Sequence, residues 1–242
     1  MLARDTGPHS RSAASGCGNL SQYASPAENG TLLFDFDNDW HGTMTQATVA
    51  LRDRDTTESR RNQTSRRILQ VSAQLFIEHG FDRVSVEDII AATGIARSSF
   101  YRLFANRKDV LARIVRPVFE RGTQLLKRPH DANARTAMDH IFSTYLTLWQ
   151  DNSQALKVSM RVGGSYFELF RDAHQAYREQ IMVLLNQAEA AGILLNGSAE
   201  RSARLIARTA IPCLEIHADL PDMKNHFFNS MRGLLLTVEE KQ

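Results

Sequence analysis

Cysteine is scarce in this chain of 242 residues, which contains only Cys17 and Cys213. Two cysteines so far apart form neither a disulfide framework nor a zinc-ligand spacing, so we interpret both as free thiols. Long apolar runs are absent too, since none approaches the ~18 residues of a membrane-spanning helix. The first thirty residues also lack the continuous apolar core of a secretory signal. We therefore expect a cytoplasmic protein that has no contact with a membrane.

Signals for catalysis are lacking as well. The sequence contains no glycine-rich phosphate loop after a strand and no recognisable nucleophile–base arrangement. We therefore predict that the protein is not an enzyme, has no catalytic residues and needs no cofactor. One cluster leaves a metal-dependent alternative open, because it contains side chains that bind divalent ions. Its members are Glu215, His217, Asp219 and His226. On a helix His217 points away from the two carboxylates, so we favour a solvated turn and predict no metal site.

Charge is distributed unevenly along the chain. Residues 59–128 contain 14 basic and 6 acidic side chains, a net charge of +8, whereas residues 1–58 carry −4 and residues 129–242 carry −2. A basic block of this size in a folded segment suits a polyanion, and nucleic acid is the most common candidate. A solvated helical surface is the competing interpretation of the charge alone.

The N-terminal quarter shows no sustained hydrophobic period. We interpret residues 1–62 as an extension that is mostly disordered, with a brief aromatic and acidic run around Phe34 and Phe36. Met44 leads directly into the more regular part, so a translation start there is an alternative, in which residues 1–43 would not belong to the natural protein.

From Thr64 onward the pattern is helical, and we predict an all-α fold. The first helix is expected over 64–79. Ser85, followed three residues later by Asp88, predicts the capped start of a short helix over 86–93. Gly94 supplies a tight turn, and a second short helix is expected over 97–104. This arrangement is a helix-turn-helix.

The second short helix has one apolar face and one polar face. Phe100 and Phe104 are expected to point inward, which leaves arginine, serine and tyrosine side chains for the groove of a DNA duplex. Arginine can donate two hydrogen bonds to guanine, and neighbouring basic and hydroxyl groups can hold phosphates. The predicted DNA-binding residues are Arg66, Arg67, Ser85, Arg97, Ser98, Ser99, Tyr101, Arg102, Arg107 and Lys108.

The stretch from Arg66 to Val115 resembles the DNA-binding domain of the TetR family of transcriptional regulators. The landmarks that carry this resemblance are Phe76, Gly80, Ser85, Ile89, Gly94, Tyr101, Phe104, Asn106, Arg107 and Leu111. The chain departs from the family pattern at Ala96, Ser98 and Leu103. The resemblance implies a DNA-binding domain over 63–108, a connecting helix over 109–128, and a domain for ligand binding and dimerisation over 129–242.

Further amphipathic stretches are expected at about 135–150, 153–161, 166–191, 199–218 and 223–240. The resemblance implies that the last two of these helices form a homodimer. The apolar residues compatible with this are Leu205, Ile206, Ile211, Leu214, Phe227, Phe228, Met231, Leu234, Leu235 and Val238. The alternative is that they complete the core of a single chain.

The same resemblance implies a ligand cavity among the middle helices, for which aromatic and methionine side chains make suitable walls. The predicted ligand-binding residues are Tyr145, Trp149, Met160, Phe167, Phe170 and Tyr177. The function expected from all of this is a repressor that a small hydrophobic or amphipathic effector releases from a pseudo-palindromic DNA operator. The alternative is a DNA-binding regulator without a small-molecule inducer, controlled by a protein partner, in which the aromatic residues are ordinary core.

Overall fold

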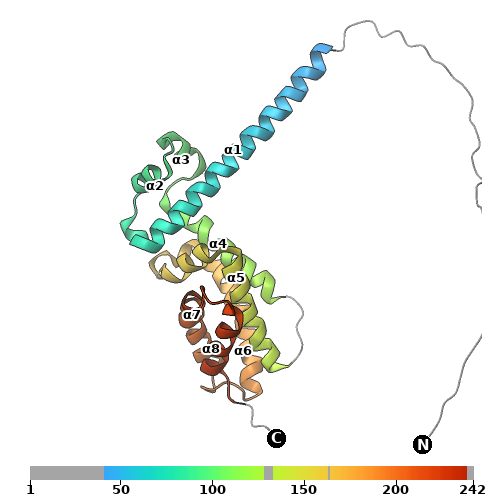
Figure 1. The fold of residues 1–242 in the computed structure, drawn as a ribbon, viewed down its shortest axis with the longest axis vertical. Coiled ribbons are helices and arrows are strands. Elements are labelled where there is room, and N and C mark those ends of the chain that lie inside the picture. The colour runs from blue at the N-terminus through green and yellow to red at the C-terminus, as the bar shows by residue number, and fades with distance from the viewer. Residues whose placement is uncertain (1–40, 128–132, 163, 239–242) are drawn as a thin grey trace, which may run out of the picture. The chain divides into compact units, whose positions relative to one another are not determined.

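The computed structural model of the protein describes residues 41–127, 133–162 and 164–238 (Figure 1). Within these residues the regular structure is helical, apart from one isolated β-bridge between Leu194 and Leu236, so the all-α prediction is confirmed. Cys17 and the aromatic run around Phe34 lie outside the described residues, whereas Cys213 is a free thiol.

Helix α1 extends from His41 to His79 and is much longer than the helix expected over 64–79. Residues 41–62, which the sequence analysis assigned to a disordered extension, are therefore helical. No proline or glycine follows Gly42 within α1, and residues 41–62 contain five threonines, four arginines and two alanines. The segment has no proline to end the helix and no apolar stripe, so its hydrophobic periodicity does not indicate a helix. The helix ends before Gly80, whose φ of 81° is in the left-handed region.

Helices α2, from Val86 to Thr93, and α3, from Arg97 to Leu103, form the predicted helix-turn-helix. The turn between them depends on Gly94, whose φ of 66° and ψ of 24° are left-handed. A short 3-10 helix, η1 from Phe81 to Arg83, connects α1 to the loop before α2. The α2 bounds agree with the sequence-based prediction, and α3 ends one residue earlier, with Phe104 as its C-cap.

Helix α4 extends from Arg107 to Leu126 and leads away from the helix-turn-helix. Asn106 caps its first turn as predicted, because its side-chain oxygen accepts hydrogen bonds from the backbone amides of Lys108 and Asp109. Beyond it lie α5 from Ala134 to Arg161, η2 from Gly164 to Phe170 and α6 from Arg171 to Ala190. The last two helices are α7 from Ala199 to Ile216 and α8 from Met223 to Leu235.

Two predicted boundaries in this part differ from the structure. The helices expected at 135–150 and 153–161 are one helix, α5, with a break at Asn152, whose φ of −164° and ψ of 88° are not helical. The Asn152 side chain accepts a hydrogen bond from the backbone amide of Ala155 and so caps the second half. The helix expected over 166–191 is divided, because Phe170 leaves the helical region between η2 and α6.

The helices after α3 pack around a common apolar core. Helix α4 lies against α5 and α6, while α7 packs against α5, α6 and α8. The approach of α4 to α6 is close enough that a Cβ at Gly122 would lie 2.5 Å from the ring of Tyr177. Glycine at 122 therefore allows the aromatic ring of α6 to lie directly on the α4 backbone.

Candidate functional site

Helix α3 is anchored by its apolar face. Phe100 and Phe104 have 0% and 1% of their surface exposed, and their ring centroids are 5.8 Å apart. The opposite face carries Arg97, Ser98 and Arg102, which are exposed, and Tyr101, which is 46% exposed. Ser99 is half-buried at the edge. The inward and outward residues of this short helix are therefore those expected from the sequence.

Arg97 lies where α2 and α3 meet. Its guanidinium forms an ion pair of 3.1 Å with Glu87 of α2 and lies 5.6 Å from the centroid of the Tyr101 ring. Both partners of the ion pair are well exposed, so water screens the attraction and the pair contributes little to stability. A phosphate or a guanine edge could therefore replace Glu87 as the partner of Arg97 at small cost.

Two residues that were predicted to contact DNA form hydrogen bonds within the protein. The Ser85 hydroxyl donates a hydrogen bond to the Asp88 carboxylate and accepts one from the Asp88 amide. The Ser85 backbone amide also donates to the Asp88 carboxylate, at 2.8 Å, and this bond completes the capping box of α2. The bonds from the Ser85 hydroxyl and amide lower the pKa of Asp88. Nη1 of Arg107 donates to the carbonyl oxygens of Phe81, Asp82 and Val84, at 2.7, 3.1 and 2.8 Å. Ser85 and Arg107 therefore hold the helix-turn-helix together.

The remaining predicted contacts are divided between two surfaces. Arg67 on α1 and Lys108 on α4 are exposed, and neither forms an ion pair within the part of the chain whose side chains are described. Arg66 is also exposed but lines a pocket between α1, α4 and α5. The face of α3, together with Arg67 and Lys108, is the candidate DNA surface.

Comparison with known proteins agrees with this geometry. Residues 68–114 match the family model described as "Bacterial regulatory proteins, tetR family", and this match covers the end of α1, the helix-turn-helix and the start of α4. This segment, residues 68–114, is of the TetR-family type. TetR proteins are regulators and not enzymes.

One curated relative shares this region. The putative mycofactocin biosynthesis transcriptional regulator MftR of Mycobacterium tuberculosis is 43% identical to this chain over 51 residues. The aligned region covers 21% of the chain and 26% of that relative, so the chain spans only about a quarter of its length.

Solved structures of TetR-family proteins share the fold over a longer stretch. A tetR-family regulatory protein from Rhodococcus RHA1 has a TM-score of 0.57 at 14% identity, covering 73% of this chain and 98% of the other. The TetR-family regulator SCO3833 of Streptomyces coelicolor A3 has a TM-score of 0.58 at 17% identity, covering 72% and 91%. At these identities the likeness shows the all-α fold alone.

A cavity of about 220 Å³ lies among α4, α5, η2, α6 and α7. It brings together five of the six residues predicted to bind a ligand, which are Tyr145, Met160, Phe167, Phe170 and Tyr177. Trp149 does not line this cavity. Tyr145 and Leu148 of α5 line the cavity. Trp149 lies on another face of α5, and the Lys157 ammonium is 5.1 Å from the centroid of the Trp149 ring.

Sequence reasoning missed the most polar group of this cavity, His174 of α6. Its ring lies between two aromatic rings, 5.0 Å from the centroid of Phe119 and 4.5 Å from that of Phe167. Nδ1 of His174 is buried without a hydrogen-bond partner. Burial and, secondarily, the charge of Arg178 lower the pKa of His174, so a neutral imidazole is favoured. The spacing of Phe170, His174 and Tyr177 along one face of a helix could have revealed it.

Two tyrosines add further polar groups to the same wall. Tyr145 and Tyr177 are each 6% exposed, and their ring centroids are 6.3 Å apart. Burial raises the pKa of both phenols, so both stay protonated at neutral pH. The cavity therefore offers an apolar surface with neutral hydrogen-bonding groups and no charged lining residue.

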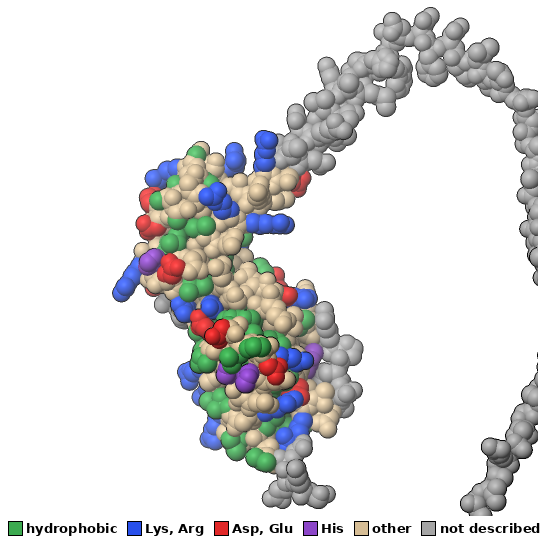
Figure 2. Space-filling model, viewed as in Figure 1, with side chains coloured by type: hydrophobic (Ala, Val, Ile, Leu, Met, Phe, Trp, Pro, Cys, Tyr) green, Lys and Arg blue, Asp and Glu red, His purple; other side chains and the backbone are tan. Residues whose placement is uncertain are grey.

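The apolar residues predicted for dimerisation differ in their burial, and Leu205 is partly buried against the core. Most of them are buried within the single chain, namely Ile206, Ile211, Leu214, Phe227, Phe228, Met231 and Leu235. The interpretation that they complete the core is therefore correct for these positions. Leu234 and Val238 are exposed, at 39% and 91%, and so are Ile216 at 72% and Leu220 at 38%. Figure 2 shows apolar side chains among charged groups and histidines on the surface of the helical part.

The residues considered for a metal site have other contacts. Glu215 forms an ion pair of 2.7 Å with Lys157 of α5, and the rings of His217 and His226 lie 5.5 Å apart between α7 and α8. No group of three or more histidine, cysteine, aspartate or glutamate side chains suited to a metal ion occurs within the described residues. In that same part of the chain, no helix is both long and apolar enough to cross a bilayer.

Proposed function

We propose that this protein is a homodimeric transcriptional regulator that binds duplex DNA through residues 63–108. The observation that carries the proposal is the orientation of α3, with its two phenylalanines buried and its arginines and Tyr101 exposed. Arg97 and Arg102 read base edges in the major groove, whereas Arg67 and Lys108 hold phosphates. Residues 109–128 connect this domain to a domain for ligand binding and dimerisation over 129–242.

The dimer forms through α7 and α8. Large apolar side chains are exposed on α7, on α8 and in the turn between them, namely Ile216, Leu234 and Leu220. They support this interface because exposed apolar side chains favour association. A symmetric pair of chains places two α3 helices about 34 Å apart, which matches successive major-groove faces of a pseudo-palindromic operator.

The cavity among α4, α5, η2, α6 and α7 binds a small effector that is largely apolar. At about 220 Å³ the cavity is below the ~300 Å³ at the lower end of usual ligand pockets, so the effector is compact. Nδ1 of His174 supplies a hydrogen bond, since an unpaired polar atom there is otherwise costly to bury. The effector releases the repressor from its operator, and a 100-fold difference in affinity corresponds to about 2.7 kcal/mol.

The cavity favours this function over a regulator controlled only by a protein partner. Coupling between the cavity and the DNA-binding helices follows from η2. Phe167 of η2 lines the cavity, while the neighbouring Tyr166 contacts Phe81 and donates a hydrogen bond to Asp82 in η1. An effector that moves Phe167 also moves the group that supports the helix-turn-helix.

The DNA-binding assignment is tested by selecting bound sequences from a random duplex pool and then measuring affinities by fluorescence anisotropy. Arg97→Ala should relax the sequence preference, because a base contact is lost, at a cost of about 1–3 kcal/mol for the preferred site. Arg67→Ala should weaken binding to all sequences alike and reduce the salt dependence. If a variant that lacks both Arg97 and Arg102 binds every DNA as tightly as the original protein, the assignment is overturned.

A further inference from the structure

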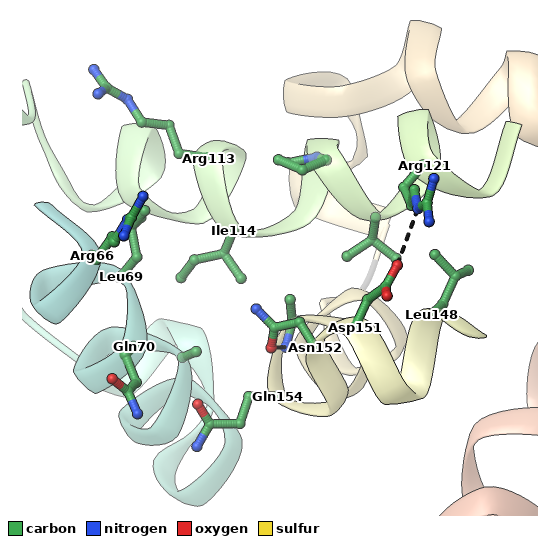
Figure 3. A pocket seen from close by; sticks show the side chains of 14 residues that line it. Arg66, Leu69, Gln70, Arg113, Ile114, Arg121, Leu148, Asp151, Asn152 and Gln154 are labelled. Atoms are coloured by element: carbon green, nitrogen blue, oxygen red, sulfur yellow. Dashed lines mark hydrogen bonds and ion pairs between the residues drawn. The ribbon is translucent and has the colours of Figure 1, made fainter. Parts of the chain in front are cut away.

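A second pocket, larger than the cavity around His174, lies where α1 meets α4 and α5. It encloses about 490 Å³ and is open to solvent at its rim (Figure 3). Its floor is apolar and consists mainly of Ile114, Pro117, Leu148 and Ala155. The two pockets share only Val118 and Leu148, which lie in the wall between them.

The charged residues of this pocket are mostly basic. Arg66 from α1 and Arg113 from α4 stand at one end, and an ion pair of 3.0 Å between Arg121 and Asp151 closes the other end (Figure 3). Three arginines thus accompany one carboxylate among the lining residues, and Arg121 already neutralises that carboxylate.

The two arginines at the open end have hydrogen-bonding capacity to spare. Arg113 uses Nε and Nη2 to bind Asp109, at 2.9 and 3.2 Å, which leaves Nη1. Arg66 forms no ion pair within the part of the chain whose side chains are described. The Arg113 guanidinium also lies 4.7 Å from the Phe104 ring centroid. Arg66 is therefore the arginine that can bind a planar carboxylate through two parallel hydrogen bonds.

We propose that this pocket binds an amphipathic carboxylate, with the head group at Arg66 and the apolar tail over Ile114, Pro117 and Leu148. A fully apolar ligand would form no ion pair with the arginines at the rim. A small inorganic anion would leave the apolar floor exposed to water. A cationic amphiphile would be repelled. Only a molecule with one anionic end and one apolar end uses both parts of the lining.

Occupancy of this pocket would act on the packing of α1. The α1 residues that line it, Leu69 and Ala73 among them, belong to the same helix that packs the helix-turn-helix, and the opposite wall belongs to α5. A bound ligand therefore stabilises one position of α1 relative to α5, next to the break of α5 at Asn152. The consequence for DNA binding rests on the proposed function, whereas ligand binding itself does not.

The experiment measures binding of sodium decanoate to the full chain by isothermal titration calorimetry, without DNA. Decyltrimethylammonium bromide serves as the probe of opposite charge. Decanoate should bind at least 10-fold more tightly than the cation. Arg66→Gln should weaken decanoate binding 5-fold or more, and Arg113→Gln should weaken it less, because Asp109 already pairs Arg113. Arg204→Gln is the matched control, since Arg204 is an exposed arginine of α7 paired with Glu200 outside the pocket.

Three results would overturn the proposal. The first is no detectable binding of decanoate at millimolar concentration. The second is equal binding of the two probes. The third is decanoate binding that Arg66→Gln and Arg113→Gln leave unchanged but Phe167→Ala abolishes, which would place the probe in the cavity around His174. Each substitution removes an exposed charge or a partly buried ring, and circular dichroism verifies the fold.

Discussion

The ring of Tyr166 stands edge-on against the ring of Phe81, with the two centroids 4.5 Å apart. The Tyr166 hydroxyl donates a hydrogen bond to the Asp82 carboxylate, and this bond raises the pKa of the phenol. Residues 84 positions apart in the chain are thereby joined at the point where the helix-turn-helix meets the helical bundle. Two further bonds support the same junction, from Arg161 to the carbonyl of Ile77 and from Gln154 to Gln74.

Tyr166→Ala should loosen η1 without unfolding the bundle, because it removes both the aromatic contact and the hydrogen bond. We expect amide hydrogen exchange at residues 81–84 to become several-fold faster while exchange in α7 is unchanged. Tyr166→Phe keeps the ring contact and should give an intermediate rate. Identical exchange at residues 81–84 in all three proteins would show that Tyr166 does not support η1.

Arg107→Ala should destabilise the protein by about 2–3 kcal/mol. The substitution leaves the carbonyl groups of Phe81, Asp82 and Val84 without their charged donor, and it removes the guanidinium that lies 4.6 Å from the Phe81 ring centroid. Urea denaturation followed by circular dichroism measures the change. Lys108→Ala is the control, and a similar loss for both variants would contradict the role given to Arg107.

Gly122→Ala should destabilise the protein by about 1–3 kcal/mol, because the added methyl group meets the Tyr177 ring. In the background of Tyr177→Ala the same substitution should cost much less, since the ring is gone. Thermal denaturation of the four proteins gives this double-mutant cycle. Additive effects of the two substitutions would show that the Tyr177 ring moves away freely. The close approach of Gly122 to this ring would then contribute nothing to the free energy of unfolding.

Acidification should destabilise the protein through His174. Its pKa is lowered in the folded state, so between its folded value and the ordinary value near 6.5 the unfolded chain binds more protons. The stability contribution of the neutral imidazole is therefore complete above this range and is lost as the pH falls through it. His174→Gln should reduce the slope of unfolding free energy against pH below about pH 6.5. Parallel curves for the two proteins would contradict this.

Ile216→Asp and Leu234→Lys should each convert the proposed dimer to a monomer, because each would bury a charge in the apolar interface. Size-exclusion chromatography with light scattering measures the mass, and circular dichroism verifies the fold. Val183→Asp provides the control, because Val183 is 53% exposed on α6. A dimer that survives both substitutions would require a different interface.

Local signals in the sequence were sufficient for the helix-turn-helix. The capping pair Ser85 and Asp88, the left-handed turn at Gly94 and the two phenylalanines of α3 act over a few residues, so their spacing predicts the structure directly. The same holds for the start of α4, where Asn106 caps the helix. The five cavity residues were also predicted, although their arrangement around one space came from the resemblance to a family.

What the amino-acid sequence determined by itself is the helical fold, the polar face of α3 and the basic middle of the chain. Tertiary structure alone decided that Arg107 binds three carbonyl groups, that Trp149 lies outside the cavity and that Arg66 lines a pocket beside α5. It also decided which apolar residues of α7 and α8 are buried within one chain. The physical reason is that each of these outcomes depends on partners distant in sequence, which local periodicity does not specify.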